Sequence, residues 1–277
     1  MNLTELTPDE YDRFCALIYK VAGNKSPATK RVMMANRLRR RLRATEIGTF
    51  AEYYAHLTSP AGAVEMPRFL DEITTNETYF YRDVHHFDWL TESFFPEVLQ
   101  AGRLRRRPKT LRIWSAAAST GEELYSIALR FAPFRTQFKD WDVTLLGTDL
   151  SGAVLATARA GSYDDRAMRL VGLEDRKRYF DRDEATQRWV LKDEIRKLPR
   201  WKIHNLLTPV RDAPFDCVFI KNVLIYFDLT SKQTVVKHLI QSLAPGGYLV
   251  VGPTEGIYSM LGALEKVKPW LYRRRAD

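Results

Sequence analysis

The sequence predicts an α/β fold with a mostly parallel sheet, preceded by a small all-helical domain. From Thr110 onward, short apolar segments alternate with helical ones: LRIWSAAA precedes ELYSIALRF, and VTLLGTDL precedes SGAVLATARA. This alternation is typical of a parallel sheet covered by helices on both faces. Over roughly the first 60 residues, apolar side chains repeat at helical spacing instead. The change of pattern predicts two domains, which a chain of 277 residues can support.

The composition excludes several classes of protein. No apolar run approaches the roughly 20 residues of a membrane helix, and MNLTELTPDEYDRF lacks the basic start and apolar core of a signal peptide. Cys15 and Cys217 lie far apart and do not have the spacing of metal ligands. We therefore expect a cytoplasmic protein with reduced thiols and no metal site, and a monomer is the default expectation.

The helical region combines two apolar stripes with a dense basic segment. Met34, Leu38 and Leu42 form one stripe at helical spacing. The segment KRVMMANRLRRRLR carries seven cations from Lys30 to Arg43, and no acidic residue occurs between Asp12 and Glu46. Arginines from Arg37 to Arg43 would then occupy the remaining surface of this helix. A solvated basic face is one interpretation, and a docking helix for an acidic partner is the other; the density of the charge favours docking. The other apolar stripe lies earlier in the chain, and it consists of Phe14, Leu17, Ile18 and Val21.

The remaining elements follow the same logic. SPAGAVEMP interrupts the helical pattern, and a further helix is expected from about Val84 to Leu99. WKIHNLL, FDCVFIKN, YLVVG and VKPWLYRRR are predicted strands, and TSKQTVVKHLIQSL is a helix that Pro245 and Gly246 stop. Ser151 is the expected N-cap of the helix SGAVLATARA. Between about 162 and 200 the alternation is interrupted, and RYFDRDEATQRWVLK predicts a small inserted hairpin there.

Polar groups follow four consecutive predicted strands. The small-residue turn SAAASTG leads into Glu122 and Glu123, and Asp149, Asn205 and Asn222 follow the next three strands. Ligands bind at the carboxyl ends of the strands in parallel sheets. Each residue also has an ordinary structural use, as a helix-dipole partner, a cap or a turn residue. Their occurrence together favours a binding site.

The chemistry of these groups narrows the ligand. A turn of small residues lets a ligand approach the backbone, and a carboxylate after the second strand can accept hydrogen bonds from ribose hydroxyls. Two acids at a helix start do not suit a phosphate, and SAAASTG has a single glycine where a dinucleotide fingerprint has three. An adenosine with a cationic amino-acid tail fits better, and S-adenosylmethionine is such a molecule.

Several motifs occur in the order found in a known family. NETYFYRD, WSAAASTGEELYSIAL, GTDLS, ARAGSY, NLL and FDCVFIKNVLIYFD, with RLRRRLR and FAEYYAHL before them, resemble the CheR family of chemotaxis-receptor methyltransferases from about Lys30 to Val251. The resemblance implies a class I S-adenosylmethionine-dependent methyltransferase fold behind a helical domain. It also implies methylation of glutamate side chains in the cytoplasmic helical bundle of methyl-accepting chemotaxis receptors, giving glutamate 5-O-methyl esters.

The resemblance also assigns domains and site residues. It implies a receptor-docking domain with a cofactor lid over residues 1–84, and a catalytic domain over 85–277 with an inserted β-subdomain at about 162–200. The family's RNV motif reads KNV here, so Lys221 keeps the charge without the planar guanidinium. The implied contacts with S-adenosylmethionine, or with its product S-adenosylhomocysteine, are Asn76, Thr78, Arg82, Glu123, Asp149, Asn205, Leu206, Asn222 and Val223.

In some family members the inserted subdomain grips a pentapeptide at the receptor's C-terminus, and these members share a glycine-containing hairpin loop. The loop FDRDEATQRW has no glycine. We therefore expect docking to receptor arrays through the basic helix around Arg37–Arg43, without pentapeptide tethering.

A substrate glutamate needs no general base, because its pKa of about 4.3 leaves it ionised at neutral pH. The site must instead hold two charged partners in line. We expect Arg82 to orient the substrate carboxylate, since its guanidinium can fork onto a carboxylate. Tyr226 could donate to the same carboxylate, or it could be an aromatic core residue with a satisfied hydroxyl.

The stretch TTNETYFYRD, residues 74–83, is then interpreted as a lid over the cofactor. Asn76 and Thr78 would supply polar contacts, and Tyr79 and Phe80 would supply apolar cover. His85 and His86 are expected to be packing or surface residues.

Two other functions are open on the sequence alone. A nucleic-acid methyltransferase would use the basic helix on phosphates, although no DPPY-like motif occurs and no aromatic residue interleaves the basic helix. A signalling module could bind the methyl donor or its product without transferring the methyl group. The pair Arg82 and Tyr226 favours an enzyme, because a pure binder would not need it.

Overall fold

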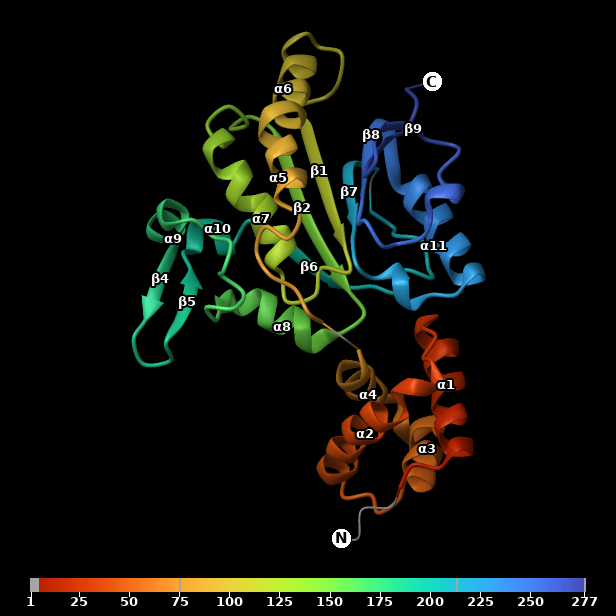
Figure 1. Ribbon diagram of the computed structural model, residues 1–277. Coiled ribbons are helices and arrows are strands. Elements are labelled where there is room, and N and C mark those ends of the chain that lie inside the picture. Colours follow the sequence, from red (N-terminus) through yellow and green to blue (C-terminus); the bar gives the residue numbers. More distant parts are fainter. Residues whose placement is uncertain (1–4, 75, 213, 277) are drawn as a thin grey trace.

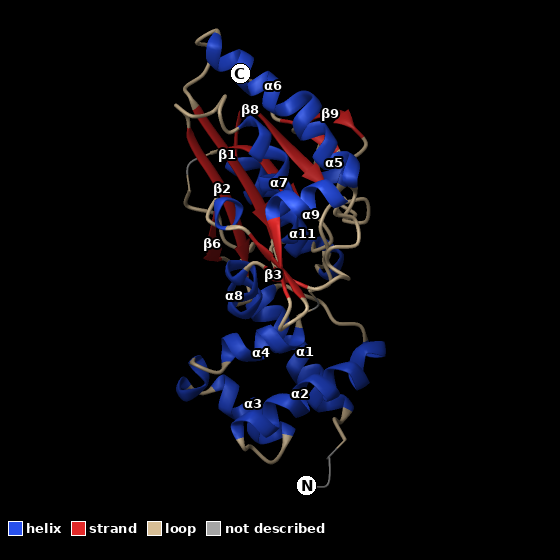
Figure 2. Ribbon diagram, turned by 90° about the vertical axis from the view of Figure 1, so that its left-hand side faces the viewer, coloured by secondary structure: helices blue, strands red, loops and turns tan. Residues whose placement is uncertain are grey.

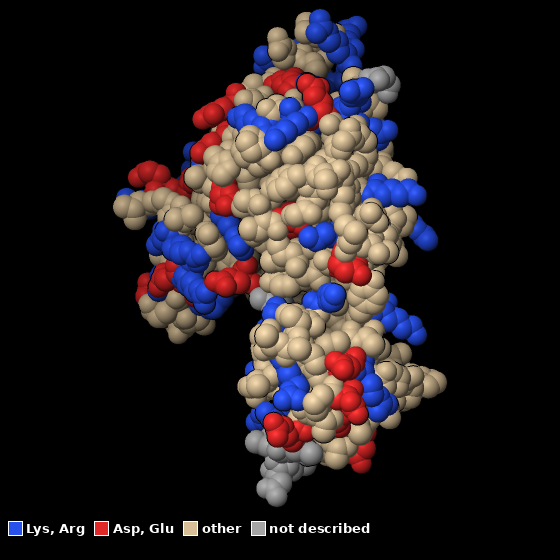
Figure 3. Space-filling view, turned by 45° about the vertical axis from the view of Figure 1, so that its right-hand side comes forward, with Lys and Arg blue, Asp and Glu red and all other residues tan. Residues whose placement is uncertain are grey.

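A computed structural model describes residues 5–74, 76–212 and 214–276, and it consists of a helical domain beneath an α/β domain (Figure 1). The two domains meet at a narrow waist in the space-filling view (Figure 3). The helical domain is built from α1 (Pro8–Ala22), the 3-10 helix η1 (Ala28–Lys30), α2 (Arg31–Thr45), α3 (Phe50–Thr58), the 3-10 helix η2 (Pro60–Ala63) and α4 (Met66–Ile73).

Local sequence explains where these helices start. Thr7 and Thr49 each accept a hydrogen bond from the backbone N–H three residues later, where a glutamate closes a capping box. The predicted stripes lie inward: Phe14, Leu17 and Ile18 are buried with Met34 and Leu38, while Val21 and Leu42 pack at the edge of the same core. The break predicted at SPAGAVEMP is present, and the chain continues from it through η2 into α4.

The α/β domain contains a seven-stranded sheet in the order β6-β2-β1-β7-β8-β10-β9, in which the first five strands are parallel. β10 and β9 close one edge in antiparallel pairing. The strands are β1 (Thr110–Ala116), β2 (Asp142–Asp149), β6 (Pro199–Ile203), β7 (Phe215–Ile220), β8 (Leu243–Val251), β9 (Glu265–Lys268) and β10 (Leu271–Arg273). The mostly parallel sheet predicted from the sequence is confirmed.

Helices cover both faces of this sheet (Figures 1 and 2). Along β1, Leu111 and Ile113 belong to one buried cluster, whereas Trp114 and Ala116 belong to another, as the two-residue period of a strand requires. The covering helices are α5 (Val84–Trp89), the π-helix η3 (Leu90–Phe94), α6 (Phe95–Arg103), α7 (Glu122–Phe131), the 3-10 helix η4 (Ala132–Phe134), α8 (Gly152–Ala160) and α11 (Leu229–Ser242), with the 3-10 helices η5 (Leu224–Tyr226) and η6 (Tyr258–Met260) in loops.

The insertion expected after α8 forms a separate three-stranded sheet, in the order β3-β5-β4. It comprises β3 (Ser162–Tyr163), α9 (Leu173–Tyr179), β4 (Phe180–Asp183), β5 (Arg188–Leu191) and α10 (Asp193–Arg196). The predicted hairpin is therefore present as β4 and β5, and β3 adds a third strand to it. The small inserted β-subdomain is confirmed.

Three boundaries differ from the prediction. The helix that begins at Val84 continues to Arg103 through a π-helical turn. α11 ends at Ser242, before Pro245, because Leu243 already pairs with Phe215 in the sheet. The segment VKPWLYRRR is not one strand: Leu271 pairs back on Lys268, so β9 and β10 are two antiparallel strands.

None of the helices in the described part of the chain combines the length and apolar character that a membrane crossing requires.

Candidate active site

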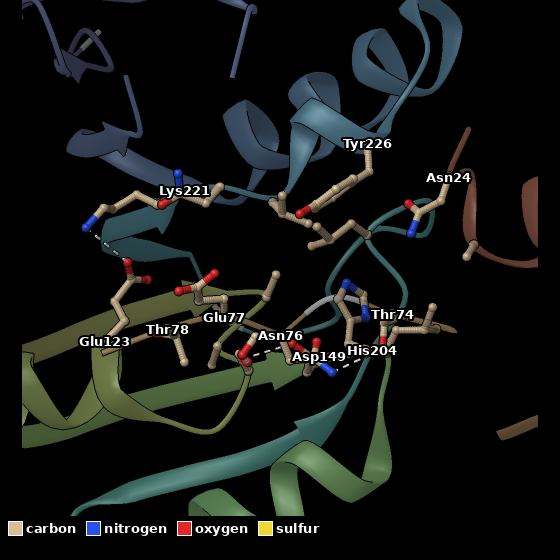
Figure 4. Close-up of a pocket in the computed structure, with 18 of the residues that line it drawn as sticks. Asn24, Thr74, Asn76, Glu77, Thr78, Glu123, Asp149, His204, Lys221 and Tyr226 are labelled. Carbon is tan, nitrogen blue, oxygen red and sulfur yellow. Dashed lines mark hydrogen bonds and ion pairs between the residues drawn. The ribbon is translucent and has the colours of Figure 1, made fainter. Parts of the chain in front are cut away.

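The residues predicted to contact the cofactor or to orient the substrate line a single pocket at the carboxyl ends of the parallel strands (Figure 4). The pocket holds about 1010 Å³ of empty volume, part of which is open to solvent. It faces the helical domain, which contributes Ala22, Asn24 and Thr74 to its wall. The predicted residues that it gathers are Asn76, Thr78, Arg82, Glu123, Asp149, Asn205, Leu206, Asn222, Val223 and Tyr226.

The turn after β1 brings backbone to the pocket surface. Ala117, Ser119 and Gly121 have φ values of 64°, 50° and 98°, so the chain makes a left-handed turn before α7 begins. A Cβ at Gly121 would lie 2.9 Å from the Cβ of Ala158, so only glycine fits there. Ala117, Ala118 and Ser119 line the pocket with small side chains, and a ligand can therefore approach their main chain closely.

Asp149 ends β2 at the floor of the pocket. Its carboxylate accepts hydrogen bonds from the backbone N–H groups of Ser119 (2.9 Å) and Ser151 (3.0 Å), and it is 9% exposed. Burial raises the pKa of Asp149, and the backbone donors oppose that shift. Because each carboxylate oxygen has two lone pairs, the side chain can still accept bonds from a ligand's hydroxyl groups. Ser151 also caps α8, as predicted, by accepting from the N–H of Val154.

The two acids at the start of α7 separate. Glu123 lines the pocket, accepts a hydrogen bond from Ser115 Oγ at 2.8 Å and lies 3.6 Å from Lys221 Nζ. Glu122 is buried outside this pocket and accepts a hydrogen bond from Thr120 Oγ1 at 2.7 Å. Burial raises the pKa of Glu122 to about 7. Only Glu123 is therefore in a position to contact a ligand in the pocket.

The loops after β6 and β7 are fixed from within. Asn205 Nδ2 donates to the carbonyl of Val21 (2.8 Å), and its Oδ1 accepts from the N–H of Leu207 (3.0 Å). Asn205 therefore acts as a turn residue, and both ends of its side-chain amide form hydrogen bonds within the protein. Asn222 has a φ of 59° and donates its backbone N–H to Glu255.

Glu255 supports the pocket from behind and was not predicted from the sequence. It is fully buried, and it also accepts the N–H of Leu224 at 2.7 Å. Its carboxylate thus holds the turn that contains Asn222 and Val223. A signal was available in the sequence, because Glu255 comes shortly after the strand YLVVG, just as the other polar candidates lie at or after the ends of their strands.

The segment after α4 crosses the pocket, as expected for a lid. Asn76, Thr78, Tyr79 and Arg82 line the cavity, whereas Thr75 lies outside the described residues. Arg82 Nη1 donates to the carbonyl of Glu77 at 3.1 Å, and its guanidinium lies 5.7 Å from the ring centre of Tyr79.

The expectation that Phe80 covers the ligand is wrong. Phe80 is fully buried in the core, with its ring 4.8 Å from that of Tyr163 and 5.5 Å from that of Phe180. Residues 79 and 80 therefore point to opposite sides of the lid. His86 is buried 4.4 Å from the ring of Trp270, and the exposed His85 also contacts that ring, which agrees with packing and surface roles.

Tyr226 stands where the pocket meets the helical domain. Its carbonyl accepts the N–H of Lys25 at 2.7 Å, and Lys30 Nζ lies 5.2 Å from its ring centre. Tyr226 also lines a second groove with Lys25 and Lys30, so one of its sides faces cations while the main pocket is rich in carboxylates. This position makes it more than a core aromatic residue.

Asn24 and His204 also line the pocket and were not predicted. Asn24 Oδ1 and His204 Nε2 are buried without a hydrogen-bond partner among the described residues. Burial lowers the pKa of His204, so the ring favours its neutral form. Unpaired buried polar atoms are costly, and a polar ligand would relieve that cost. Asn24 reaches the pocket only through domain packing, which no local pattern predicts.

The pocket fits an adenosyl sulfonium compound better than a phosphate-bearing one. Three carboxylates line it, those of Glu77, Glu123 and Asp149. These acids suit ribose hydroxyls, an ammonium group and a sulfonium charge. In the described ranges, no group of three or more His, Cys, Asp and Glu side chains is arranged to hold a metal ion.

Comparison with known proteins agrees with this geometry. Residues 9–74 match the family model "CheR methyltransferase, all-alpha domain", and residues 76–271 match "CheR methyltransferase, SAM binding domain". A probable chemotaxis protein methyltransferase of Rhizobium etli is 36% identical over 245 residues, which cover 87% of this chain and 90% of the relative. The chemotaxis protein methyltransferase of Escherichia coli is 35% identical over 263 residues, 92% of this chain and 88% of the relative.

A third relative, the chemotaxis protein methyltransferase of Salmonella typhimurium, is 34% identical over 266 residues, which cover 92% of this chain and 86% of the relative. The resemblance drawn from the motifs is thus confirmed, as is the class I methyltransferase fold with an all-helical N-terminal domain. From its sequence and its architecture together, the chain belongs to the CheR methyltransferase family.

Proposed function

We propose that this protein transfers the methyl group of S-adenosylmethionine to glutamate side chains of methyl-accepting chemotaxis receptors, giving glutamate 5-O-methyl esters. One observation carries the proposal: an acidic pocket and the pair Arg82 and Tyr226 lie together at the strand ends of a CheR methyltransferase fold. When bound, the cofactor supplies a methyl group activated by a sulfonium charge. The chain itself supplies binding, orientation and exclusion of water.

Cofactor binding is assigned to the strand-end loops and the lid. Asp149 would accept hydrogen bonds from the ribose hydroxyls, because its carboxylate lines the pocket at the end of β2. Glu123 would face the cationic amino-acid tail. The adenine ring would lie between two loops: the main chain of Asn205 and Leu206 on one side, and the turn at Asn222 and Val223 on the other. Asn76 and Thr78 would close the pocket from the lid.

Substrate orientation is assigned to Arg82 and Tyr226. Arg82 uses one donor on the carbonyl of Glu77, and a guanidinium has five donors, so others remain for a carboxylate. Tyr226 would donate its hydroxyl to the same carboxylate from the side of the helical domain. The substrate is already ionised at neutral pH, so these residues orient it and remove no proton.

Receptor docking is assigned to α2, within a docking domain and lid formed by residues 1–84; residues 85–277 would form the catalytic domain. The predicted basic face needs one change, because Arg41 turns inward and pairs with Glu65 at 2.8 Å beside the buried Tyr53. Arg40 and Arg43 are exposed. Acidic and basic side chains both occur on the face of the helical domain that Figure 3 shows, and we assign docking to α2 alone.

The hairpin of the inserted subdomain supports docking without a pentapeptide tether. Its turn is closed by Asp183, whose carboxylate accepts from the N–H of Ala185 (2.9 Å) and from Thr186 Oγ1 (2.7 Å), and Gln187 adopts a φ of 54°. The turn therefore forms without glycine. We assign receptor recognition to α2 and propose that the protein works as a monomer on receptor arrays, without metal or nucleic acid.

The test combines calorimetry with S-adenosylmethionine and S-adenosylhomocysteine and tritiated methyl transfer to chemoreceptor membranes. We expect both nucleosides to bind and the transferred label to be base-labile, as an ester is. Binding without transfer would favour the signalling module, and salt-sensitive RNA binding with methylated RNA would favour a nucleic-acid enzyme. Neither alternative is favoured by the family to which the chain belongs.

A further inference from the structure

Lys221 has more partners than a structural lysine requires. Its side chain is 2% exposed. Its Nζ donates to the carbonyl of Arg82 at 2.6 Å and lies 3.2 Å from Asp83 Oδ2 and 3.6 Å from Glu123 Oε2. The ammonium group also lies 5.2 Å from the ring centre of Phe87. An ammonium group has three donors, and three acceptors surround this one.

These acceptors come from two different parts of the site. Arg82 and Asp83 belong to the lid, whereas Glu123 belongs to α7, and Figure 4 shows the ion pair of Lys221 and Glu123 at the pocket wall. Lys221 itself follows β7, the central strand between β1 and β8. The ammonium group of Lys221 therefore links the lid to α7, the helix that carries Glu123 in the pocket wall.

The lid needs such a contact. Tyr81 and Asp83 have φ values of 58° and 61°, in the left-handed region that is unfavourable for residues other than glycine. The N–H of Tyr81 donates to Ser126 Oγ at 2.9 Å, and Lys221 holds the carbonyl of the residue between them. The two contacts fix the backbone on which the Arg82 side chain is mounted.

We propose that Lys221 is a positioning residue with two effects: it fixes the backbone of Arg82 so that the guanidinium faces the substrate, and it keeps Glu123 ionised for the cofactor. The proposal rests on the proposed function, because it assigns a role to Lys221 within that pocket. It concerns a position where this chain carries lysine in place of the arginine in the family motif.

The charges around Glu123 support the second effect. Burial raises the pKa of Glu123, and Asp83 raises it further, whereas Lys221 and the hydroxyl of Ser115 lower it. Lys221 is therefore the cation that opposes burial and the neighbouring Asp83, and its removal would favour the protonated form of Glu123.

The experiment compares three variants at this position with a matched control. Lys221→Met removes both effects, Lys221→Gln keeps donors for the Arg82 carbonyl without the charge, and Lys221→Arg restores the charge. Lys202→Met is the control, because Lys202 also pairs with an aspartate, Asp212 at 3.2 Å, but lies outside the pocket. Affinity for S-adenosylhomocysteine is measured by calorimetry at about pH 6 and about pH 8, because the lower pH favours the protonated form of a buried carboxyl group.

For Lys221→Met, we expect affinity at about pH 6 to fall about tenfold or more, because burial without a cation keeps Glu123 protonated and the ligand's ammonium group loses its anionic partner, and to recover in part at about pH 8. Lys221→Gln should show the same pH dependence with a smaller loss of kcat in methyl transfer. Lys221→Arg should remove the pH dependence, and Lys202→Met should match the wild type throughout. Thermal unfolding checks that each variant is folded.

Each outcome decides the matter. If the wild type binds and transfers methyl while Lys221→Met does both equally well with an unchanged pH profile, Lys221 has no positioning role and the inference fails. If Lys221→Met does not fold, Lys221→Gln carries the same comparison, and equal affinity at both pH values in that variant overturns the proposal. If the wild type ignores both nucleosides, the proposed function fails first.

Discussion

The side-chain amide of Asn205 donates a hydrogen bond to the carbonyl of Val21 at 2.8 Å, which ties the loop after β6 to the end of α1. Two more bonds cross the same junction: Lys25 N–H to the carbonyl of Tyr226 at 2.7 Å, and Tyr19 hydroxyl to Asp228 at 2.8 Å. The helical domain is therefore attached at the rim of the pocket.

Asn205→Ala should weaken cofactor binding as well as the fold. The change removes the bond to Val21 and the turn bond to Leu207, each worth about 1 kcal/mol, so affinity for S-adenosylhomocysteine should fall about fivefold or more. Tyr19→Phe is the control, since it removes a junction bond at an exposed site away from the pocket. Calorimetry on both variants tests this, and equal affinities would show that the Asn205 tie has no bearing on the pocket.

Arg82→Ala should abolish most methyl transfer while the protein stays folded. Without the guanidinium the substrate carboxylate loses its orienting partner, and misplacement of this kind costs about a hundredfold in rate. Arg82→Lys keeps a cation without the fork and should recover only part of the rate. Initial rates of tritium transfer to receptor membranes measure this, with circular dichroism as the check on folding. Near-normal turnover in Arg82→Ala would remove Arg82 from the mechanism.

Tyr226→Phe should lower kcat by about tenfold, since a hydrogen bond to a charged group is worth roughly 1.5–3 kcal/mol. The ring stays, so its contact with Lys30 and the backbone bond to Lys25 should persist, and cofactor affinity should be unchanged. Steady-state kinetics and calorimetry separate the two quantities. A loss of cofactor affinity with unchanged kcat would place the hydroxyl on the cofactor and not on the substrate.

The buried carboxyl group of Glu122 should make the free energy of unfolding depend on pH. Burial raises its pKa from 4.5 to about 7, so the folded protein holds this proton more tightly than the unfolded chain does. Stability should therefore fall as the pH rises from about 4.5 to about 7 and stay low above that range. Glu122→Gln keeps an acceptor for Thr120 and cannot ionise, so it should unfold with a free energy on the order of 2–3 kcal/mol higher than wild type at pH 8 and nearly equal at pH 4.5.

Denaturant unfolding at those two pH values gives the comparison. Glu265→Gln is the control, because Glu265 is exposed on β9 and its replacement should leave both values unchanged. A stabilising effect of Glu122→Gln that is the same at both pH values would show that ionisation of this carboxyl is not its cause.

The docking assignment predicts a change in receptor methylation without a change in the pocket. Arg40→Glu with Arg43→Glu reverses two exposed charges on α2, and like-charge contacts with an acidic receptor surface should raise KM for receptor about tenfold or more. Affinity for S-adenosylhomocysteine should stay at the wild-type value. Arg103→Glu with Arg106→Glu is the matched control, because both arginines are exposed, Arg103 at the end of α6 and Arg106 in the loop after it. If both pairs raise KM equally, general charge and not α2 governs the association.

Much of this architecture could be read from local patterns. The strand–helix alternation, the two stripes of the helical domain and the cap at Ser151 all depend on spacing within one element, and each is present. The residues at strand ends were also informative, because parallel strands bring their carboxyl ends together and this does not depend on the conformation of the loops. This is why Asp149, Asn222 and Glu123 could be placed in one pocket in advance.

Other features depend on contacts between distant elements. The direction of Phe80 is set by Tyr163 and Phe180, which lie in the insertion, and Asn24 enters the pocket only because the helical domain docks there. Arg41 turns inward because Glu65 offers a buried carboxylate. Helical spacing alone gave no reason to separate Arg41 from Arg40 and Arg43.

The wall formed by Ala22, Asn24 and Thr74 has a consequence for protein engineering. A chimaera that exchanged the helical module for that of another receptor system would change the binding cavity together with the target. Retargeting would succeed only if the donor module carried matching residues at these positions, and a fragment that began after residue 75 would leave the cavity without one side.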